Sequence, residues 1–348
     1  MKYYITYYKR KETHPNPTFM DFLAGITNET TYEKTTVLVD ATQEELLNRV
    51  SKIRVPEPLP LTPDKIKYTT FLVPKRKGGY RTINAPEPTL MRSLEAYKIY
   101  FETLSILPHE SAHAYVKNRS TITALRPHQQ NESKWFLKID FSDFFGSFNK
   151  ERILEQFSKV YPLNGLLISD SRQKIEQIIE HCLKDGVLPQ GAPTSPSITN
   201  ICMVPIDYAI DNYCKKANLV YTRYADDMII SGKEPFDFIS LVRAINTKLT
   251  PEWLNINPAK TRYGSNGGRN WNLGLMLNKN NEITIGHKKK EILKATIFNA
   301  LINDLSAQEK METAGYIAYA RQIEQDYVNA IIKKLEQKTG QNLKERLK

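Results

Sequence analysis

Two adjacent aspartates, Asp226 and Asp227, interrupt an apolar stretch that spans residues 220–231. Apolar and β-branched residues on both sides are typical of short strands, so the stretch predicts a hairpin with an acidic turn. Neighbouring carboxylates repel each other and resist removal from water. A bound divalent cation would remove that penalty. An exposed acidic turn without a metal would explain the pair equally well if it stood alone.

A third carboxylate, Asp140, ends a strand-like run that begins at Trp135, and a helix start is expected near Asn149. Mg²⁺ takes oxygen ligands and is usually held by one or two carboxylates together with substrate phosphates. Two such ions, about 3.5–4 Å apart, serve polymerases and nucleases in in-line phosphoryl displacement. Asp140 together with the acidic hairpin therefore fits either class of enzyme.

The segment between these carboxylates is more specific. Residues 186–197 form a loop rich in Gly, Pro and Ser that leads into an apolar helical run over 198–209. In this order the segments resemble the palm motifs of reverse transcriptases, with residues 140–145, 188–196 and 224–227 matching the first, second and third motifs. The Gln-Gly-x-x-x-Ser-Pro string of the second motif distinguishes this family far better than the aspartate pair does.

The resemblance extends from about residue 71 to about residue 286. Residues 71–86 are similar to the fingers hairpin, and the Gly78–Gly79 pair is a hairpin-turn signal. Residues 254–262 resemble the fourth palm motif, and residues 273–278 resemble the hairpin that grips the primer end. The first 60 and last 60 residues carry no string of the family.

The resemblance implies an α+β fold of the right-hand polymerase type, with fingers, a palm built on an antiparallel sheet, and a helical thumb. In that division residues 1–60 are an N-terminal extension, 61–135 the fingers, 136–285 the palm with a fingers insertion, and 286–348 the thumb.

The resemblance also implies the roles of individual residues. The expected metal ligands are Asp140, Asp226, Asp227 and the backbone carbonyl of Phe141. Lys260 is expected to be catalytic, as a proton donor to the leaving pyrophosphate. The nucleotide-binding residues are expected to be Lys75 or Lys77 and Arg81 at the triphosphate, Gln190 at the incoming nucleotide, and Phe145 at the sugar. Packing in the core, like its aromatic neighbours, is the alternative for Phe145.

Within the family, residues 112–120 and the motifs above resemble bacterial retron polymerases and related antiphage enzymes. Two strings differ from the retron pattern. Ala124 and Leu125 stand where retron enzymes have Asn-Ala ahead of a histidine, here His128, and residues 272–274 replace a Val-Thr-Gly string. These differences favour the broader group of defence-associated reverse transcriptases.

Composition agrees with a nucleic-acid partner. The chain of 348 residues has 49 Lys and Arg against 38 Asp and Glu, a formal charge of +11, which favours polyanions. Its three cysteines, Cys182, Cys202 and Cys214, show no metal-ligand spacing and are expected to be reduced, packed thiols of a cytoplasmic protein. Because no apolar run approaches about 18 residues, a membrane role is not expected.

Outside the motifs, helical spacing predicts helices over residues 41–50, 90–107, 292–305 and 320–335, the last two belonging to the thumb. Residues 1–10 are expected to form a short edge strand, although an aromatic and basic run could also stack on bases.

The sequence thus predicts an RNA-directed DNA polymerase with two Mg²⁺ ions as cofactor and Mn²⁺ as the alternative ion. Its expected partners are a structured noncoding RNA as template and as one option for the primer, deoxynucleoside triphosphates, an RNA/DNA duplex product and an effector protein, in antiphage defence. A catalytically idle RNA-binding scaffold and a template-independent polymerase are the alternatives. The three aspartates argue against the scaffold, which has no need for them.

Overall fold

The computed structural model describes residues 1–10, 32–61, 65–75, 78–104, 106, 108–265 and 273–348. The chain forms two compact units, each assembled from separate stretches of sequence. Unit 1 comprises Met1–Tyr115, Phe141–Ile210 and Asn246–Asn255, and unit 2 comprises Val116–Asp140, Asp211–Ile245 and Ile256–Lys348. The division into extension, fingers, palm and thumb remains a prediction.

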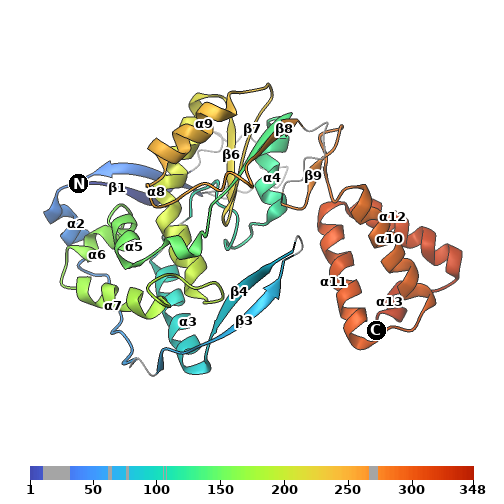
Figure 1. Cartoon of the computed structure of the whole chain (residues 1–348), viewed down its shortest axis with the longest axis horizontal. Helices are drawn as coiled ribbons and strands as arrows, with labels where there is room; N and C mark the ends of the chain where they lie inside the picture. Colours follow the sequence, from blue (N-terminus) through green and yellow to red (C-terminus); the bar gives the residue numbers. More distant parts are fainter. Residues whose placement is uncertain (11–31, 62–64, 76–77, 105, 107, 266–272) are drawn as a thin grey trace, which may run out of the picture. The chain divides into compact units, whose positions relative to one another are not determined.

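Unit 2 is built on a four-stranded antiparallel sheet. Its strand order is β6 (Val220–Tyr224), β7 (Asp227–Gly232), β5 (Trp135–Asp140) and β8 (Arg262–Ser265). Figure 1 labels β6, β7 and β8 of this sheet. Helix α4 (Thr121–Gln130) packs against β6. The predicted acidic hairpin is confirmed, because β6 and β7 pair with each other and leave Ala225 and Asp226 in the turn.

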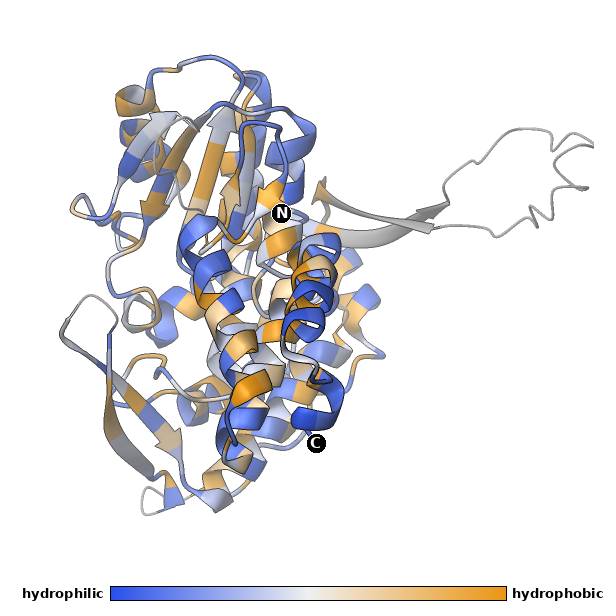
Figure 2. Cartoon of the chain, turned by 90° about the vertical axis from the view of Figure 1, so that its right-hand side faces the viewer, coloured by the Kyte–Doolittle hydropathy of each residue, from blue (hydrophilic) through white to orange (hydrophobic). Residues whose placement is uncertain are grey.

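Helices after the sheet complete unit 2. A short hairpin of β9 (Met276–Leu277) and β10 (Ile283–Thr284) lies where the primer-grip hairpin was predicted, and α10 to α13 follow it. One hydrophobic core joins Phe136 and Ile229 of the sheet to Ile297 and Ile317 of the helices. Figure 2 shows that the helices near the C-terminus carry hydrophobic residues as well as hydrophilic ones. The helix bounds are α10 His287–Ile302, α11 Ala307–Ile323, α12 Gln325–Thr339 and α13 Leu343–Arg346.

The predicted helix over residues 320–335 is wrong as a single element, because the chain breaks at Glu324 between α11 and α12. The Glu324 carboxylate accepts hydrogen bonds from the Thr284 hydroxyl at 2.8 Å and the Ile285 N–H at 2.9 Å. It also pairs with Lys290 at 2.5 Å. Glu324, at the break, thus makes tertiary contacts that helical periodicity cannot reveal. The helix predicted at 292–305 also differs, running from His287 to Ile302.

Unit 1 contains two hairpins and a set of helices. The predicted first strand is confirmed as β1 (Lys2–Arg10), which pairs with β2 (Tyr32–Asp40). Strands β3 (Tyr68–Pro74) and β4 (Tyr80–Pro86) form a hairpin where one was predicted, and its place in the fingers remains a prediction. The helices and helical turns placed wholly in unit 1 are α2 Gln43–Val50, α3 Pro88–Thr103, η2 Phe145–Ser147, α5 Lys150–Phe157, α6 Leu163–Leu167 and α7 Arg172–Cys182. Helix α8, Thr194–Lys216, begins in unit 1 and ends in unit 2.

Local sequence signals explain several helix ends. Thr42 forms a capping box with Glu45 at the start of α2, and the Asn149 side chain caps α5. The helix predicted over residues 90–107 instead ends at Thr103. Within the described residues, none of the helices has the length and hydrophobicity that a membrane crossing requires.

The three cysteines are buried free thiols, as expected. Burial raises the pKa of Cys182 and of Cys214 to about 12. Thiolates are the reactive form of cysteine, so these side chains act as packing groups.

Candidate active site

The ends of β5 and β7 bring two of the predicted carboxylates together. Asp140 is the last residue of β5 and lies directly opposite Asp227, the first residue of β7. Residues paired in this way have Cβ atoms about 4.5–5.5 Å apart. Asp226 precedes Asp227 in the turn, whose sharp reversal places Ala225 at a φ of 58°. The sheet thus gathers the three aspartates at one edge of unit 2.

A lysine neutralises the most buried of these carboxylates. Asp140 is 8 % exposed, and the Lys260 ammonium donates to both of its oxygens, at 2.8 and 3.0 Å. The Asn257 N–H donates to the Asp140 carbonyl at 2.7 Å, which fixes the loop that carries Lys260. The hydrogen bond to Asp140 raises the pKa of Lys260, with further contributions from the charges of the aspartates. Lys260 is therefore held protonated, as a proton donor must be before it acts.

The acidic cluster perturbs Asp227 in particular. Desolvation by the surrounding protein raises the pKa of Asp227 to about 6, and the charges of Asp226 and Asp140 add to this effect, although Lys260 opposes it. The Asp227 residue itself remains exposed at the start of β7. Neighbouring negative charges destabilise the ionised form of a carboxylate, and a bound cation would stabilise it.

This pKa predicts a pH-dependent stability of the metal-free protein. Because the pKa of Asp227 is raised from 3.8 to about 6 on folding, the folded state binds this proton more tightly than the unfolded state. Its contribution to stability is therefore lost as pH rises through about 6. In the presence of a chelator, the melting temperature of the wild type should fall relative to that of Asp227→Asn between about pH 4 and pH 7. If the melting temperatures of the two proteins changed with pH in parallel, the raised pKa of Asp227 would be contradicted.

The carboxylates suit a hard divalent cation. Asp140, Asp226 and Asp227 offer only oxygen donors, which is the ligand type that Mg²⁺ and Mn²⁺ prefer. At Asp140, the positively charged Lys260 ammonium already forms an ion pair with the carboxylate. Phe141 lies next in the chain, and its buried ring stacks on Phe144 at 5.8 Å; its carbonyl remains a predicted ligand. The residues present therefore fit a metal site.

A buried histidine that the sequence analysis did not assign to the site braces the acidic hairpin. His128 of α4 is fully buried, with Nδ1 2.5 Å from the Ser231 hydroxyl and Nε2 2.8 Å from the Thr222 hydroxyl. Ser231 donates in turn to the Ser133 hydroxyl at 2.7 Å. His128 thus ties both strands of the hairpin to α4. The string around His128 was visible in the sequence, but its partners, about a hundred residues away, were not.

Phe145 differs from the aromatic residues around it. Phe141, Phe144 and Phe148 are 2, 4 and 0 % exposed, whereas Phe145 in the helical turn η2 is only half-buried. The centroids of the Phe145 and Phe144 rings are 5.5 Å apart, and the two rings pack edge to face. Phe145 is therefore partly exposed, whereas the aromatic residues around it are buried.

The loop of residues 188–196 is fixed through its backbone to the hairpin of β3 and β4. The Asn84 N–H of β4 donates to the Gln190 carbonyl at 2.7 Å. At Gly191, with a φ of 116°, a Cβ atom would lie 2.7 Å from the Asn84 carbonyl, so only glycine fits this approach. The buried Ser195 hydroxyl closes the loop by donating to the Pro189 carbonyl at 2.7 Å. These contacts explain the glycine and the serine of the motif string.

The cations predicted at the triphosphate lie on the same hairpin. Lys75 and Arg81 are exposed near its turn, where the Lys75 N–H donates to the Gly79 carbonyl at 2.9 Å. Lys77 lies outside the described residues. The structure thus places Asp140, Asp226, Asp227 and Lys260 in unit 2, and Lys75, Arg81, Phe145 and Gln190 in unit 1.

The chain is similar to known proteins. A family model described as reverse transcriptase (RNA-dependent DNA polymerase) matches residues 73–317. Retron Ec83 reverse transcriptase of Escherichia coli is 28 % identical over 294 residues, covering 80 % of this chain and 89 % of the relative. Retron Ec73 reverse transcriptase of the same species is 29 % identical over 272 residues, covering 75 % and 85 %. Among solved structures, apo telomerase from Candida tropicalis matches 86 % of this chain and 65 % of its own, with a TM-score of 0.45 and 12 % identity.

Proposed function

The chain belongs to the reverse transcriptase (RNA-dependent DNA polymerase) family, and we propose that it copies a dedicated structured RNA into DNA with two divalent metal ions. The predicted family, its α+β fold and its polymerase activity are confirmed by this membership and by the likeness to retron enzymes. The observation that most supports the metal mechanism is the pairing of Asp140 with Asp227, one residue from Asp226, at the edge of the sheet.

In this proposal the metal ions are Mg²⁺, with Mn²⁺ as the alternative, and they are held by Asp140, Asp226, Asp227 and the Phe141 carbonyl. When bound, they lower the pKa of the primer hydroxyl and neutralise charge on the leaving pyrophosphate. Lys260 leaves its pairing with Asp140 and donates its proton to the pyrophosphate.

The remaining residues bind and orient the nucleotide. The cations of the fingers hairpin, Lys75 or Lys77 and Arg81, hold the triphosphate, because guanidinium and ammonium groups suit phosphate oxygens. Gln190, whose backbone is fixed to β4, contacts the incoming nucleotide. Phosphoryl transfer needs positioning and charge neutralisation more than covalent help, so these roles are sufficient.

The RNA partner is proposed on two grounds. The formal charge of +11 favours a polyanion, and the similar proteins that cover most of the chain are retron reverse transcriptases. We infer that a structured noncoding RNA supplies the template and a hydroxyl for priming, and that an effector protein completes a system for antiphage defence. Sequencing the nucleic acid that copurifies with the wild type tests this inference, and finding no RNA–DNA product of defined sequence would contradict it.

Phe145 is expected to exclude ribonucleotides. This half-buried residue follows Asp140, the last residue of β5, by five positions, and we expect its ring to clash with a 2′ hydroxyl. A clash discriminates more strongly than the loss of one apolar contact. Phe145→Ala should raise ribonucleotide incorporation and leave deoxynucleotide extension largely intact. Primer extension with each nucleotide set measures this ratio.

Phe144→Ala serves as the control for that experiment. Phe144 is 4 % exposed, so its truncation should destabilise the fold by about 3–5 kcal/mol and reduce both activities together. If Phe145→Ala behaved like Phe144→Ala, Phe145 would be a packing residue and would not select the sugar.

A further inference from the structure

A buried arginine lies just before the acidic turn of unit 2. Arg223 of β6 is 1 % exposed, and it is the largest of the fully buried side chains among the described residues. Burying a charge is costly unless the charged group is hydrogen-bonded or paired. An unbranched apolar side chain of similar length, such as methionine, would fill the same position without that cost. Packing alone therefore does not explain an arginine at this position.

The guanidinium of Arg223 bonds to the backbone of the turn. Its Nη1 donates a hydrogen bond to the Ala225 carbonyl at 3.0 Å, and hydrogen bonds from an ionised donor are about twice as strong as neutral ones. The Ala225 carbonyl belongs to the peptide unit that joins Ala225 to Asp226. Because a peptide unit is planar and rigid, the bond fixes the orientation of this unit and the direction in which the Asp226 backbone begins.

The conformation of the turn requires such a restraint. Tyr224 pairs with Asp227, so the loop between β6 and β7 has two residues, Ala225 and Asp226. Ala225 has a φ of 58°. Both turn types that are common in two-residue hairpin loops place the first loop residue at positive φ, where glycine, asparagine or aspartate is preferred. The Cβ atom of alanine makes this conformation costly, and strained residues persist only where the surrounding structure holds them.

We propose that Arg223 is a positioning residue for the metal site. Its hydrogen bond to the Ala225 carbonyl holds the strained turn, so that Asp226 and Asp227 are presented beside Asp140 at the edge of the sheet. Arg223 touches neither the metal ion nor the substrate in this role, because it acts through the backbone of the turn. The role rests on the proposed function, of which the metal site is a part, whereas the restraint that Arg223 places on the turn does not.

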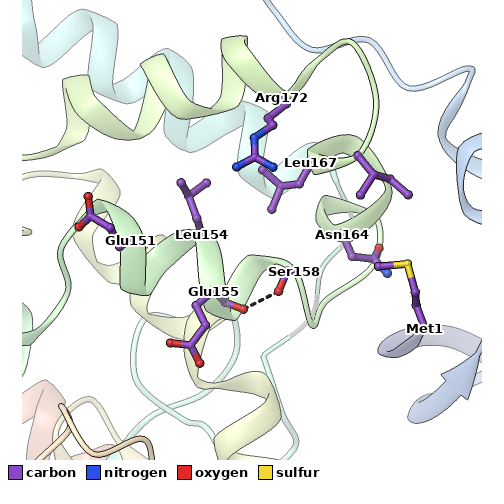
Figure 3. A pocket seen from close by; sticks show the side chains of 9 residues that line it. Met1, Glu151, Leu154, Glu155, Ser158, Asn164, Leu167 and Arg172 are labelled. Atoms are coloured by element: carbon purple, nitrogen blue, oxygen red, sulfur yellow. Dashed lines mark hydrogen bonds between the residues drawn. The ribbon is translucent and has the colours of Figure 1, made fainter. Parts of the chain in front are cut away.

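Binding of Mn²⁺ to the full chain, measured by calorimetry without nucleotide or RNA, tests this role. The Mn²⁺ binding that Asp226→Asn removes identifies the aspartate site. At that site Arg223→Met should weaken Mn²⁺ binding by about 10–100-fold, the usual effect of removing a group that orients metal ligands. Arg172→Met makes the same chemical change in unit 1, where Arg172 is exposed at the pocket shown in Figure 3, and should leave this binding unchanged.

Glycine at position 225 provides a rescue that a packing role would not show. Since glycine adopts a positive φ without a steric penalty, adding Ala225→Gly to Arg223→Met should recover most of the lost Mn²⁺ affinity. Arg223→Lys keeps the buried charge and replaces Arg223→Met in the test if the latter does not fold. Lysine lacks the planar fork of arginine, so Arg223→Lys should also weaken Mn²⁺ binding, and Ala225→Gly should restore it.

Amide hydrogen exchange without metal separates this role from the metal site itself. Residues 224–227 should exchange at least about tenfold faster in Arg223→Met than in the wild type, relative to exchange in α12, because one hydrogen bond from a charged donor is lost. If the wild type binds Mn²⁺ at the aspartate site and neither variant at Arg223 weakens it, the positioning role is overturned. If the wild type binds no Mn²⁺ there while exchange in the turn responds to Arg223→Met, the proposed metal site fails and the restraint by Arg223 stands.

Discussion

Replacing Asp226 by asparagine should reduce DNA synthesis by at least about 10³-fold, because the metal stabilisation that depends on this carboxylate is worth several kcal/mol and each 1.36 kcal/mol changes the rate tenfold. The fold should survive the substitution. Asp226 lies in a turn beside Asp227, whose pKa its charge raises, so its neutralisation relieves repulsion, and the variant should melt no lower than the wild type in the absence of metal.

Incorporation of labelled deoxynucleotide on a primed RNA template measures the effect. Asp170→Asn makes the same chemical change at an exposed position outside the aspartate cluster and should leave the rate unchanged. Near-normal incorporation by Asp226→Asn would remove the hairpin aspartate from the proposed mechanism.

RNA affinity should depend steeply on salt. If the chain neutralises about 6–10 phosphates, binding should weaken by about 10³–10⁵ between 50 and 200 mM salt, because condensed counterions are released. Exposed lysines of α10, such as Lys288 and Lys294, are candidates for these contacts. Filter binding of the copurifying RNA across this range gives the slope of log affinity against log salt.

The double variant Lys288→Gln and Lys294→Gln should reduce that slope by about 0.9 for each lysine that contacts a phosphate. Its melting temperature should not change, because the buried residues of α10, such as Leu293, are untouched and surface substitutions alter stability little. A flat salt response of the wild type would argue against an RNA held through its backbone.

The sequence predicted the parts of the site whose signals are local. The acidic hairpin was visible because apolar residues surround Asp226 and Asp227, and β6 and β7 pair as that pattern requires. The Gly191 and Ser195 positions of the second motif were recognised as a string, and the structure supplies their physical reasons, a close approach to β4 and a side-chain bond to Pro189.

Features that depend on distant contacts could not be predicted. Helical periodicity continues through Glu324, yet the helix is interrupted there, and the Glu324 carboxylate contacts Thr284, Ile285 and Lys290. His128 engages hydroxyls about a hundred residues away. Such contacts depend on the packing of whole elements, about which the local pattern of residues carries no information.

The ion pair between Lys260 and Asp140 could likewise not be predicted from the sequence. The two residues are 120 positions apart, and the loop that carries Lys260 is fixed by a backbone bond from Asn257. In the sequence, only the position of Lys260 in a family motif pointed to a role for it. The structure adds a physical role, because the ammonium that we propose as the proton donor to the pyrophosphate also neutralises the buried Asp140 carboxylate.

Primer extension on an RNA template of defined sequence, followed by sequencing of the product, tests the central claim most directly. The account predicts DNA complementary to the template from the wild type with Mg²⁺, and no product from Asp226→Asn or in the presence of a chelator. DNA unrelated to the template would identify a template-independent polymerase. No DNA from the wild type on any primed RNA would contradict the account and favour a scaffold that binds RNA without copying it.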